Sequence, residues 1–266
     1  MPIHCPVSIA CLSPEEFEKV DYGVIGHAYA SQNELGRLCD ECAHKADLKA
    51  RLLADNLDSV RLEVPVTVTH RNFSKRYFLD LVASDALYEV KAQKNLSGEH
   101  DAQLLNYMFL LGIQRGKLLN FRSPKVQGRI IATGLTHVER RRFVASTEHW
   151  RDLTAACTTL RQTLLELLQD WGAFLEVALY QEALVHFLGG ASNIERWVKL
   201  HRGGVDLGGQ RMFVHAPGIA FRLTAFSEGH PHIESHLRRL LAMTDLEAMQ
   251  WVNFNHSKIE FAIVTK

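Results

Sequence analysis

Residues 77–92 read YFLDLVASDALYEVKA and carry three charged side chains inside two apolar runs. The first run, residues 77–82, holds Asp80, and the second, residues 87–92, holds Glu89 and Lys91. The short connection between the runs predicts a β-hairpin. Because side chains alternate along a strand, Glu89 and Lys91 share one face. The stretch therefore predicts two carboxylates and an ammonium group on one patch of sheet.

Charges on strands of this kind need a compensating partner. A divalent cation is one such partner, because Mg²⁺ prefers carboxylate, carbonyl and water oxygens. An ion-paired strand face, with Lys91 against Asp80 or Glu89, explains the same spacing without a metal. The spacing alone leaves both interpretations open.

Further blocks flank this hairpin. Upstream, residues 31–41 read SQNELGRLCDE and lead into a helix that we expect to reach about Ala54. Downstream, residues 99–108 (EHDAQLLNYM) predict a second helix, and residues 117–121 (KLLNF) predict a strand. With these blocks in order, residues 24–131 resemble the GxxExxY branch of the PD-(D/E)XK nuclease-like superfamily.

The resemblance has departures. Leu38 stands where the naming motif has Gly, Glu41 keeps the Glu, and His44 replaces the Tyr. Leu79 stands where the superfamily often has Pro before the Asp. These positions shape the backbone or the rim of the site, so they leave fine specificity open more than metal binding.

The resemblance implies a fold and a site. The implied fold class is α/β (α+β), a restriction-endonuclease-like mixed central sheet flanked by helices, in a domain of residues 1–136. The implied catalytic residues are Asp80, Glu89, Lys91, Glu41 and Gln103. The implied cofactor is Mg²⁺ or Mn²⁺, held by Asp80, Glu89, Glu41 and the carbonyl of Val90. Lys91 would orient the attacking water or stabilise developing charge, and Gln103 would bond a phosphate or Lys91.

The implied function is a metal-dependent nuclease that hydrolyses phosphodiester bonds, with DNA as the expected substrate and RNA left open. The alternative is a catalytically silent module with the same fold that binds nucleic acid or a protein partner. The complete charged set favours the enzyme. The formal net charge of zero favours the module, because no global field draws the chain to nucleic acid. The oligomeric state, including a homodimer, stays open.

Length and composition set further bounds. The 266 residues are enough for one large or two ordinary domains. No apolar run approaches the roughly 20 residues that span a bilayer, so we expect no membrane partner. The first residues, MPIHCP, lack the basic start and apolar stretch of a signal peptide, which predicts a cytoplasmic protein.

Two cysteines, Cys39 and Cys42, form a C-x-x-C pattern, with Cys5 and Cys11 upstream. Four sulfur atoms are a ligand set for zinc or an iron–sulfur cluster. Small apolar side chains on a buried helix face are the simpler interpretation. We expect Cys39 and Cys42 to be free, buried thiols.

Residues 137–266 predict an additional C-terminal α+β region whose role the sequence leaves open. The basic run at residues 137–143 (HVERRRF) is expected to be a solvated linker. Periodicity predicts helices over residues 150–168, 171–188 and 233–243 and strands over residues 210–214, 219–226 and 258–264. We interpret His232 and His236 as a solvated helix start, because no third ligand is evident.

Overall fold

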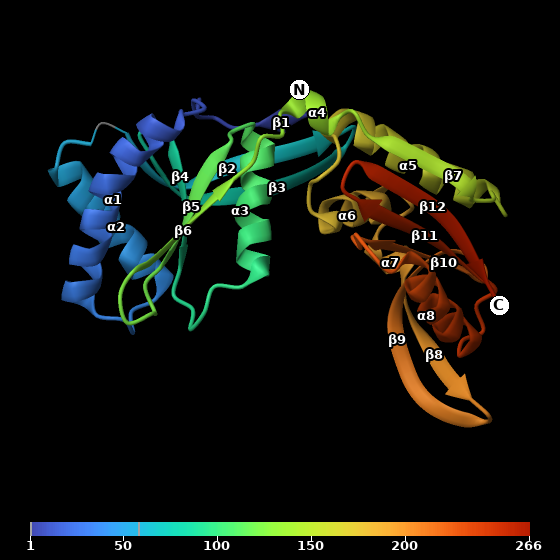
Figure 1. Ribbon diagram of the computed structural model, residues 1–266. Coiled ribbons are helices and arrows are strands. Elements are labelled where there is room, and N and C mark those ends of the chain that lie inside the picture. The colour runs from blue at the N-terminus through green and yellow to red at the C-terminus, as the bar shows by residue number, and fades with distance from the viewer. Residues whose placement is uncertain (1, 58) are drawn as a thin grey trace. The chain divides into compact units, whose positions relative to one another are not determined.

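The computed structural model describes residues 2–57 and 59–266. The chain divides into two compact units, Met1–His137 and Val138–Lys266 (Figure 1). Each unit contains a six-stranded mixed sheet flanked by helices, which confirms the predicted fold class. Within the described residues, no helix combines the length and the apolar character needed to cross a membrane.

The sheet of the N-terminal unit has its strands in chain order. Its strands are β1 (Ile3–His4), β2 (Val60–His70), β3 (Phe73–Ala83), β4 (Ala86–Lys91), β5 (Arg115–Asn120) and β6 (Gln127–Ala132). β4 and β5 run parallel, and the other neighbours are antiparallel. Helix α3 (Gly98–Leu111) connects β4 to β5, because a parallel pair requires a crossover.

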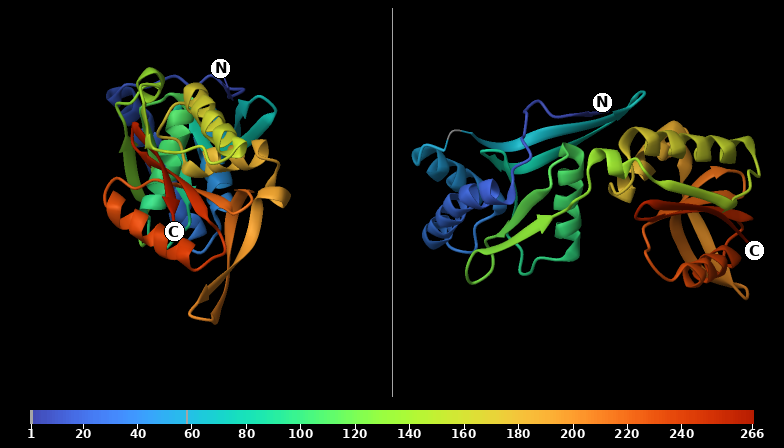
Figure 2. Two further views of the ribbon diagram at one scale, coloured as in Figure 1. Left: turned by 90° about the vertical axis from the view of Figure 1, so that its right-hand side faces the viewer. Right: turned by 45° about the horizontal axis from the view of Figure 1, so that its top comes forward.

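Helices cover both faces of this sheet (Figure 2). On one face, α1 (Pro14–Leu35) and α2 (Glu41–Ala54) share a core with Tyr88 and Val90 of β4. Alternation then places Glu89 and Lys91 on the opposite face. α3 lies on that face, since a Cβ at Gly116 would lie 3.0 Å from Leu104 of α3, and Gly116 pairs with Leu87.

The expected helix from Ser31 to Ala54 is interrupted. α1 ends at Leu35, and Gly36 follows with φ +76°, a conformation that favours glycine. The chain re-enters a helix only at Glu41, after Asp40 at the N-cap position. The start of α1 agrees with its sequence, because Ser13 and Glu16 form a capping box.

This interruption corrects the prediction for the C-x-x-C pattern. Cys39 and Cys42 are free thiols, but Cys42 is exposed and Cys39 is partly exposed. Cys39 lies in the loop before α2, so the two side chains do not share a buried helix face. Leu38 beside them is also exposed.

The sheet of the C-terminal unit has the order β7-β12-β11-β10-β9-β8. Its strands are β7 (Val144–His149), β8 (Glu195–Arg202), β9 (Val205–Ala216), β10 (Ile219–Thr224), β11 (Ala248–Asn255) and β12 (Lys258–Thr265). β10 and β11 run parallel, as do β7 and β12, and the other neighbours are antiparallel. Helix α8 (His230–Ala242) connects β10 to β11.

Helices also cover both faces of the second sheet (Figure 2). Leu237 and Leu241 of α8 pack with Met212 and Trp251 on one face. Cys157 of α5 (Ala155–Trp171) packs with strand residues on the other. α6 (Val177–Phe187) and the single turn α7 (Ala191–Ile194) contact β10 and β8.

Several boundaries in this unit differ from the sequence predictions. The helices predicted over residues 150–168 and 171–188 are present, but α5 begins at Ala155 and ends at Trp171 before Gly172, at φ +82°, and α6 begins only at Val177. β7, β8 and β11 were not predicted, since their polar side chains obscure the alternation. The expected strands at residues 210–214, 219–226 and 258–264 are present as β9, β10 and β12.

The basic run at residues 137–143 is not a solvated linker throughout. It contains the short helix α4 (His137–Arg140), and Arg140 is buried. The Arg140 guanidinium donates to the carbonyl of Ala173 at 3.2 Å. Burial lowers the pKa of Arg140 to about 10. The expectation failed because the apolar aliphatic part of an arginine packs readily when its head group finds carbonyl oxygens.

Candidate active site

A tight turn positions the two strands that carry the charged residues. Ser84 and Asp85 join β3 to β4 with φ of +45° and +68°, as in the type I′ turns of hairpins. The paired residues extend from the turn to Leu81 and Tyr88. Asp80 and Glu89 come next on the two strands, so they face each other where the strands separate.

Both oxygen atoms of the Asp80 carboxylate have partners. The Val90 N–H donates to Oδ2 at 2.9 Å, and Lys45 of α2 donates to Oδ1 at 2.8 Å. Lys45 also pairs with Glu63 of β2, which lies between Leu62 and Val64, the partners of Leu81 and Leu79 on β3. Burial would lower the pKa of Lys45, but the two carboxylates outweigh burial and raise it. Lys45 is therefore a fixed positive charge beside Asp80.

Sequence reasoning missed Lys45 and Glu63. A local signal for Lys45 was present, because it follows Glu41 by four residues and so lies on the same side of α2. Its partner Asp80 is 35 residues away in the sequence. Only the tertiary fold brings the two side chains together.

Glu89 is the least satisfied group of this cluster. Its side chain is 2% exposed, and Lys91 donates to Oε1 at 2.6 Å. Oε2 is buried and has no hydrogen-bond partner among the described residues. Burial and the neighbouring Asp80 carboxylate raise the pKa of Glu89 to about 7, against the opposing effect of Lys91. The site thus holds a buried carboxyl group whose negative charge Lys91 compensates only in part.

The remaining candidate residues lie close by or elsewhere. Glu41, at the first position of α2, accepts from the Ala92 N–H at 3.0 Å and so joins α2 to the end of β4. Gln103 donates to the Tyr107 hydroxyl at 3.0 Å, one turn along α3, rather than to the charged cluster. The backbone group of Val90 that contacts Asp80 is its N–H, which donates to Oδ2, and not its carbonyl.

An asparagine fixes the end of β4. Asn120 lies opposite Lys91 on the parallel neighbour β5. Its amide donates to the carbonyl of Gln93 at 2.8 Å, and its oxygen accepts from the Gln93 N–H at 3.0 Å. The Phe121 N–H donates to the Lys91 carbonyl at 2.8 Å. These bonds continue the sheet beyond β4 and hold the backbone at Lys91.

His44, which replaces the motif tyrosine, has a packing role. It is fully buried and stacks on Phe121 with ring centroids 4.2 Å apart. Burial lowers the pKa of His44, which favours the neutral ring. The departure from the motif thus keeps an aromatic ring at this position.

The donor set suits a hard divalent cation. Asp80 and Glu89 are adjacent carboxylates, and the unpartnered Oε2 of Glu89 offers a free oxygen. Within the described residues, no group of three or more His, Cys, Asp or Glu side chains is gathered as a metal cage. A cation at this point would therefore rely on two carboxylates, backbone oxygens and water, as Mg²⁺ commonly does.

Comparison with known families agrees with this geometry. Residues 18–131 match the model of the PD-(D/E)XK nuclease superfamily. The match lies within the N-terminal unit and supports a nuclease-type function. No curated protein and no solved structure matches the chain.

Proposed function

We propose that the chain is a divalent-metal-dependent nuclease that hydrolyses phosphodiester bonds, with DNA as the expected substrate. The observation that carries the proposal is the buried, unpartnered Oε2 of Glu89 beside Asp80. A buried carboxylate oxygen without a hydrogen-bond partner is costly, and carboxyl groups with perturbed pKa values concentrate at functional sites. Within the matched superfamily, we assign the chain to the GxxExxY branch as part of this proposal.

Each residue of the cluster has a proposed task. Asp80 and Glu89 would hold Mg²⁺ or Mn²⁺, which when bound polarises the scissile phosphate and acidifies a water molecule. The Lys91 ammonium, fixed by Glu89, would stabilise negative charge on the phosphate oxygens. Glu41 would position the end of β4 through Ala92. Gln103, in the second turn of α3, would contact a substrate phosphate.

One observation favours the second candidate, a silent nuclease-type module. The Lys45 ammonium already lies 2.8 Å from Asp80 Oδ1. An internal cation reduces the negative charge that would attract a metal ion. A chain that uses Lys45 in this way would keep the fold and bind nucleic acid without cleaving it.

Incubation of the purified protein with plasmid, linear duplex, single-stranded DNA and RNA separates the two candidates. We expect cleavage with Mg²⁺ or Mn²⁺ and none with EDTA. Asp80→Ala should abolish cleavage and weaken Mn²⁺ binding in calorimetric titration. Asp101→Ala, which removes a carboxylate paired with Arg129, is the matched control and should retain both. Equal activity of the parent and Asp80→Ala would refute the nuclease assignment.

A further inference from the structure

One order of elements occurs twice along the chain. In the N-terminal unit, α1 and α2 precede the antiparallel strands β2, β3 and β4, and then come α3, β5 and β6. In the C-terminal unit, α5 and α6 precede β8, β9 and β10, and then come α8, β11 and β12. In both sheets these five strands lie in chain order, and the third and fourth are parallel. The units differ in the short helices α4 and α7 and in the added strands β1 and β7 (Figure 1).

An asparagine in each unit fixes the correspondence residue by residue. Asn253 lies opposite Thr224 on the parallel pair, as Asn120 lies opposite Lys91. Asn253 donates to the carbonyl of Phe226 and accepts from its N–H, both at 2.9 Å. Phe226 is the second residue after Thr224, as Gln93 is the second after Lys91. Thr224 therefore corresponds to Lys91, and two residues earlier Arg222 corresponds to Glu89.

The pairing of β9 with β10 identifies the third counterpart, that of Asp80. The paired residues of β9 and β10 extend to Phe213 and Phe221, and the strands separate beyond them. By the asparagine correspondence Phe221 is the counterpart of Tyr88, where pairing ends in the N-terminal unit. The next residue of β9, Met212, is thus the counterpart of Asp80. The counterparts of Asp80, Glu89 and Lys91 are Met212, Arg222 and Thr224.

We propose that residues 138–266 form a second nuclease-type unit, which has lost its metal site and binds single-stranded nucleic acid. Met212 and Thr224 carry no charge, and Arg222 brings a cation where the N-terminal unit has a carboxylate. A guanidinium group binds phosphate oxygens directly and needs no metal ion. The choice of nucleic acid as ligand is consistent with the proposed function, whereas the correspondence rests on the fold alone.

A hollow lies at the position that corresponds to the charged cluster. Its volume is about 190 Å³, and it opens where β9 and β10 separate. Its lining includes Gln181, Gln210, Arg211, Met212, Arg222 and Leu223. Arg222 is exposed and forms no ion pair with any described residue. Arg211 is held by Glu195, with Nε and Oε2 2.7 Å apart. Two guanidinium groups therefore border one hollow.

An exposed aromatic side chain lies beside Arg211, on the face of the sheet opposite to Met212 and Arg222. Trp197 of β8 lies directly opposite Arg211 of β9 and is 72% exposed. Its indole lies over Gly209, where a Cβ would be only 2.0 Å from Nε1. The ring thus lies on the backbone of the strand, and its outer face is open for a nucleobase to stack.

The charge of the β8–β9 hairpin suits the same ligand. The cationic residues of the hairpin are Arg196, Lys199, Arg202 and Arg211, and its acidic residues are Glu195 and Asp206. The hairpin thus has an excess of positive charge, although the formal net charge of the whole chain is zero. Alternation places Arg211, Lys199 and Trp197 on one face of the sheet and Arg222 on the other, so the hollow between the separated strands is what joins them. A strand that passes this opening would place phosphates at Arg222 and Arg211 and a base on Trp197.

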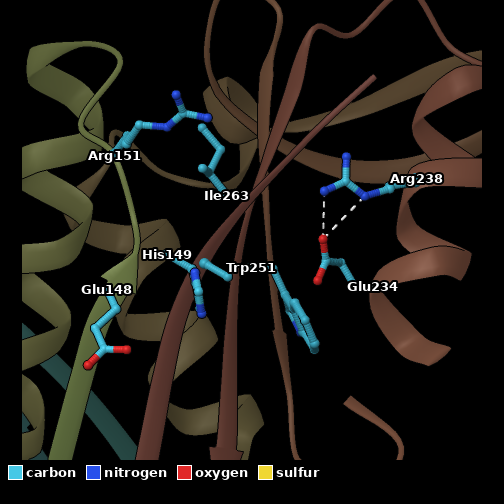
Figure 3. A pocket seen from close by; sticks show the side chains of 8 residues that line it. Glu148, His149, Arg151, Glu234, Arg238, Trp251 and Ile263 are labelled. Carbon is cyan, nitrogen blue, oxygen red and sulfur yellow. Dashed lines mark hydrogen bonds and ion pairs between the residues drawn. The ribbon is translucent and has the colours of Figure 1, made fainter. Parts of the chain in front are cut away.

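Another hollow of this unit has different chemistry. It has a volume of about 310 Å³ and is lined by residues of β7, β11, β12 and α8 (Figure 3). Its Arg238 is bound to Glu234, with Nη2 and Oε1 2.6 Å apart, and Glu148 adds a second carboxylate. This balance does not favour phosphate. Arg151 in its lining serves as a matched control for Arg222.

Binding of labelled oligothymidylate to the full chain in EDTA tests the proposal, with duplex DNA and oligouridylate as further probes. Trp150, Trp171 and Trp251 are buried, so a nucleic acid that stacks on Trp197 should quench fluorescence chiefly at that residue. We expect Arg222→Gln and Trp197→Ala each to weaken binding about tenfold. Arg222→Lys should recover most of the affinity, and Arg151→Gln should leave it unchanged.

The outcomes separate this proposal from the nuclease assignment. Binding in EDTA that depends on Arg222 and Trp197 supports it, whether or not the chain cleaves. Cleavage by the parent, together with unchanged affinity of Arg222→Gln and Trp197→Ala, would overturn it and leave the nuclease assignment intact. Tight binding of duplex alone, or an equal loss in Arg151→Gln, would also overturn it.

Discussion

The two units build the same strand arrangement around different side chains. Where the N-terminal unit has Asp80, Glu89 and Lys91, the C-terminal unit has Met212, Arg222 and Thr224. The asparagine bonds to the backbone occur in both units, with donor–acceptor distances from 2.8 to 3.0 Å. The same backbone arrangement can therefore present side chains of different chemistry.

At the corresponding positions, the units also differ in how well their polar groups are satisfied. The Thr224 hydroxyl donates to Asn253 Oδ1 and accepts from the Trp251 indole, both at 2.8 Å. In the corresponding part of the N-terminal unit, Glu89 Oε2 has no hydrogen-bond partner among the described residues. A folded protein tolerates such a cost where a ligand supplies the missing interaction. From this contrast we expect metal binding in the N-terminal unit.

The largest expected difference comes from Lys91→Ala and Thr224→Ala. Lys91→Ala should reduce cleavage about a hundredfold or more, because it removes a charge that stabilises the transition state. Its Mn²⁺ affinity should be retained or increased, since a repelling cation is gone. Thr224→Ala should leave cleavage unchanged. Single-turnover cleavage and Mn²⁺ titration measure both effects, and parent-like cleavage by Lys91→Ala would make Lys91 a structural ion-pair partner.

Lys45→Met should increase Mn²⁺ affinity about tenfold, because it removes the ammonium group bound to Asp80 Oδ1. Lys117→Met is the matched control, since Lys117 is a buried lysine of the same unit paired with Asp21. Calorimetric titration measures both variants. Binding by Lys45→Met but not by the parent would identify the natural chain as the silent module. Weaker binding by Lys45→Met would contradict the competition between lysine and metal.

A pair of asparagine variants tests the correspondence between the units. Asn120→Ala and Asn253→Ala each leave a strand end without two hydrogen bonds, which should cost on the order of 1–3 kcal/mol of unfolding free energy. Asn120→Ala should also reduce cleavage, because the backbone at Lys91 loses its support. Urea unfolding and cleavage assays give the two measurements. Reduced cleavage in Asn253→Ala would show that the units do not act separately.

The smallest effect is an opposite pH dependence of the two units. The pKa of Glu89 is raised to about 7, so its ionisation opposes folding and stability falls as pH rises from about 4.5 to 7. Burial lowers the pKa of His215 to about 4, so stability of the C-terminal unit falls as pH drops from 6.5 to 4. Each change should be on the order of 1–3 kcal/mol.

Urea unfolding at several pH values measures this difference. All four tryptophans belong to the C-terminal unit, so their fluorescence follows that unit, whereas circular dichroism follows both. Glu89→Gln should remove the loss at higher pH, and His215→Gln should reduce the loss at lower pH. Unchanged pH profiles in these variants would assign the dependence to other groups.

Local patterns predicted the parts of the fold that local interactions determine. The hairpin around Ser84 and Asp85 and the capping box of Ser13 follow from short-range sequence rules. Alternation along β4 likewise separated Glu89 from Tyr88 and Val90. These features depend on residues within a few positions of one another.

Other features depend on distant contacts that one sequence does not reveal. Lys45 reaches Asp80 only because α2 packs beside β2 and β4. β11 was missed because Gln250 and Asn253 interrupt an otherwise apolar strand. The repeated strand order was invisible because its shared element, an asparagine opposite a parallel strand, depends on pairing between segments.

The position of β12 has a consequence for the order in which the chain folds during synthesis. β12 lies between β7 and β11, so the second sheet lacks an interior strand until residues 258–265 have been made. The first sheet is complete once β6 ends at Ala132. At roughly 5–20 residues per second, the ribosome needs on the order of ten seconds to make the remaining strands. The N-terminal unit can therefore fold first on the ribosome, whereas β7 cannot pair until β12 has been made.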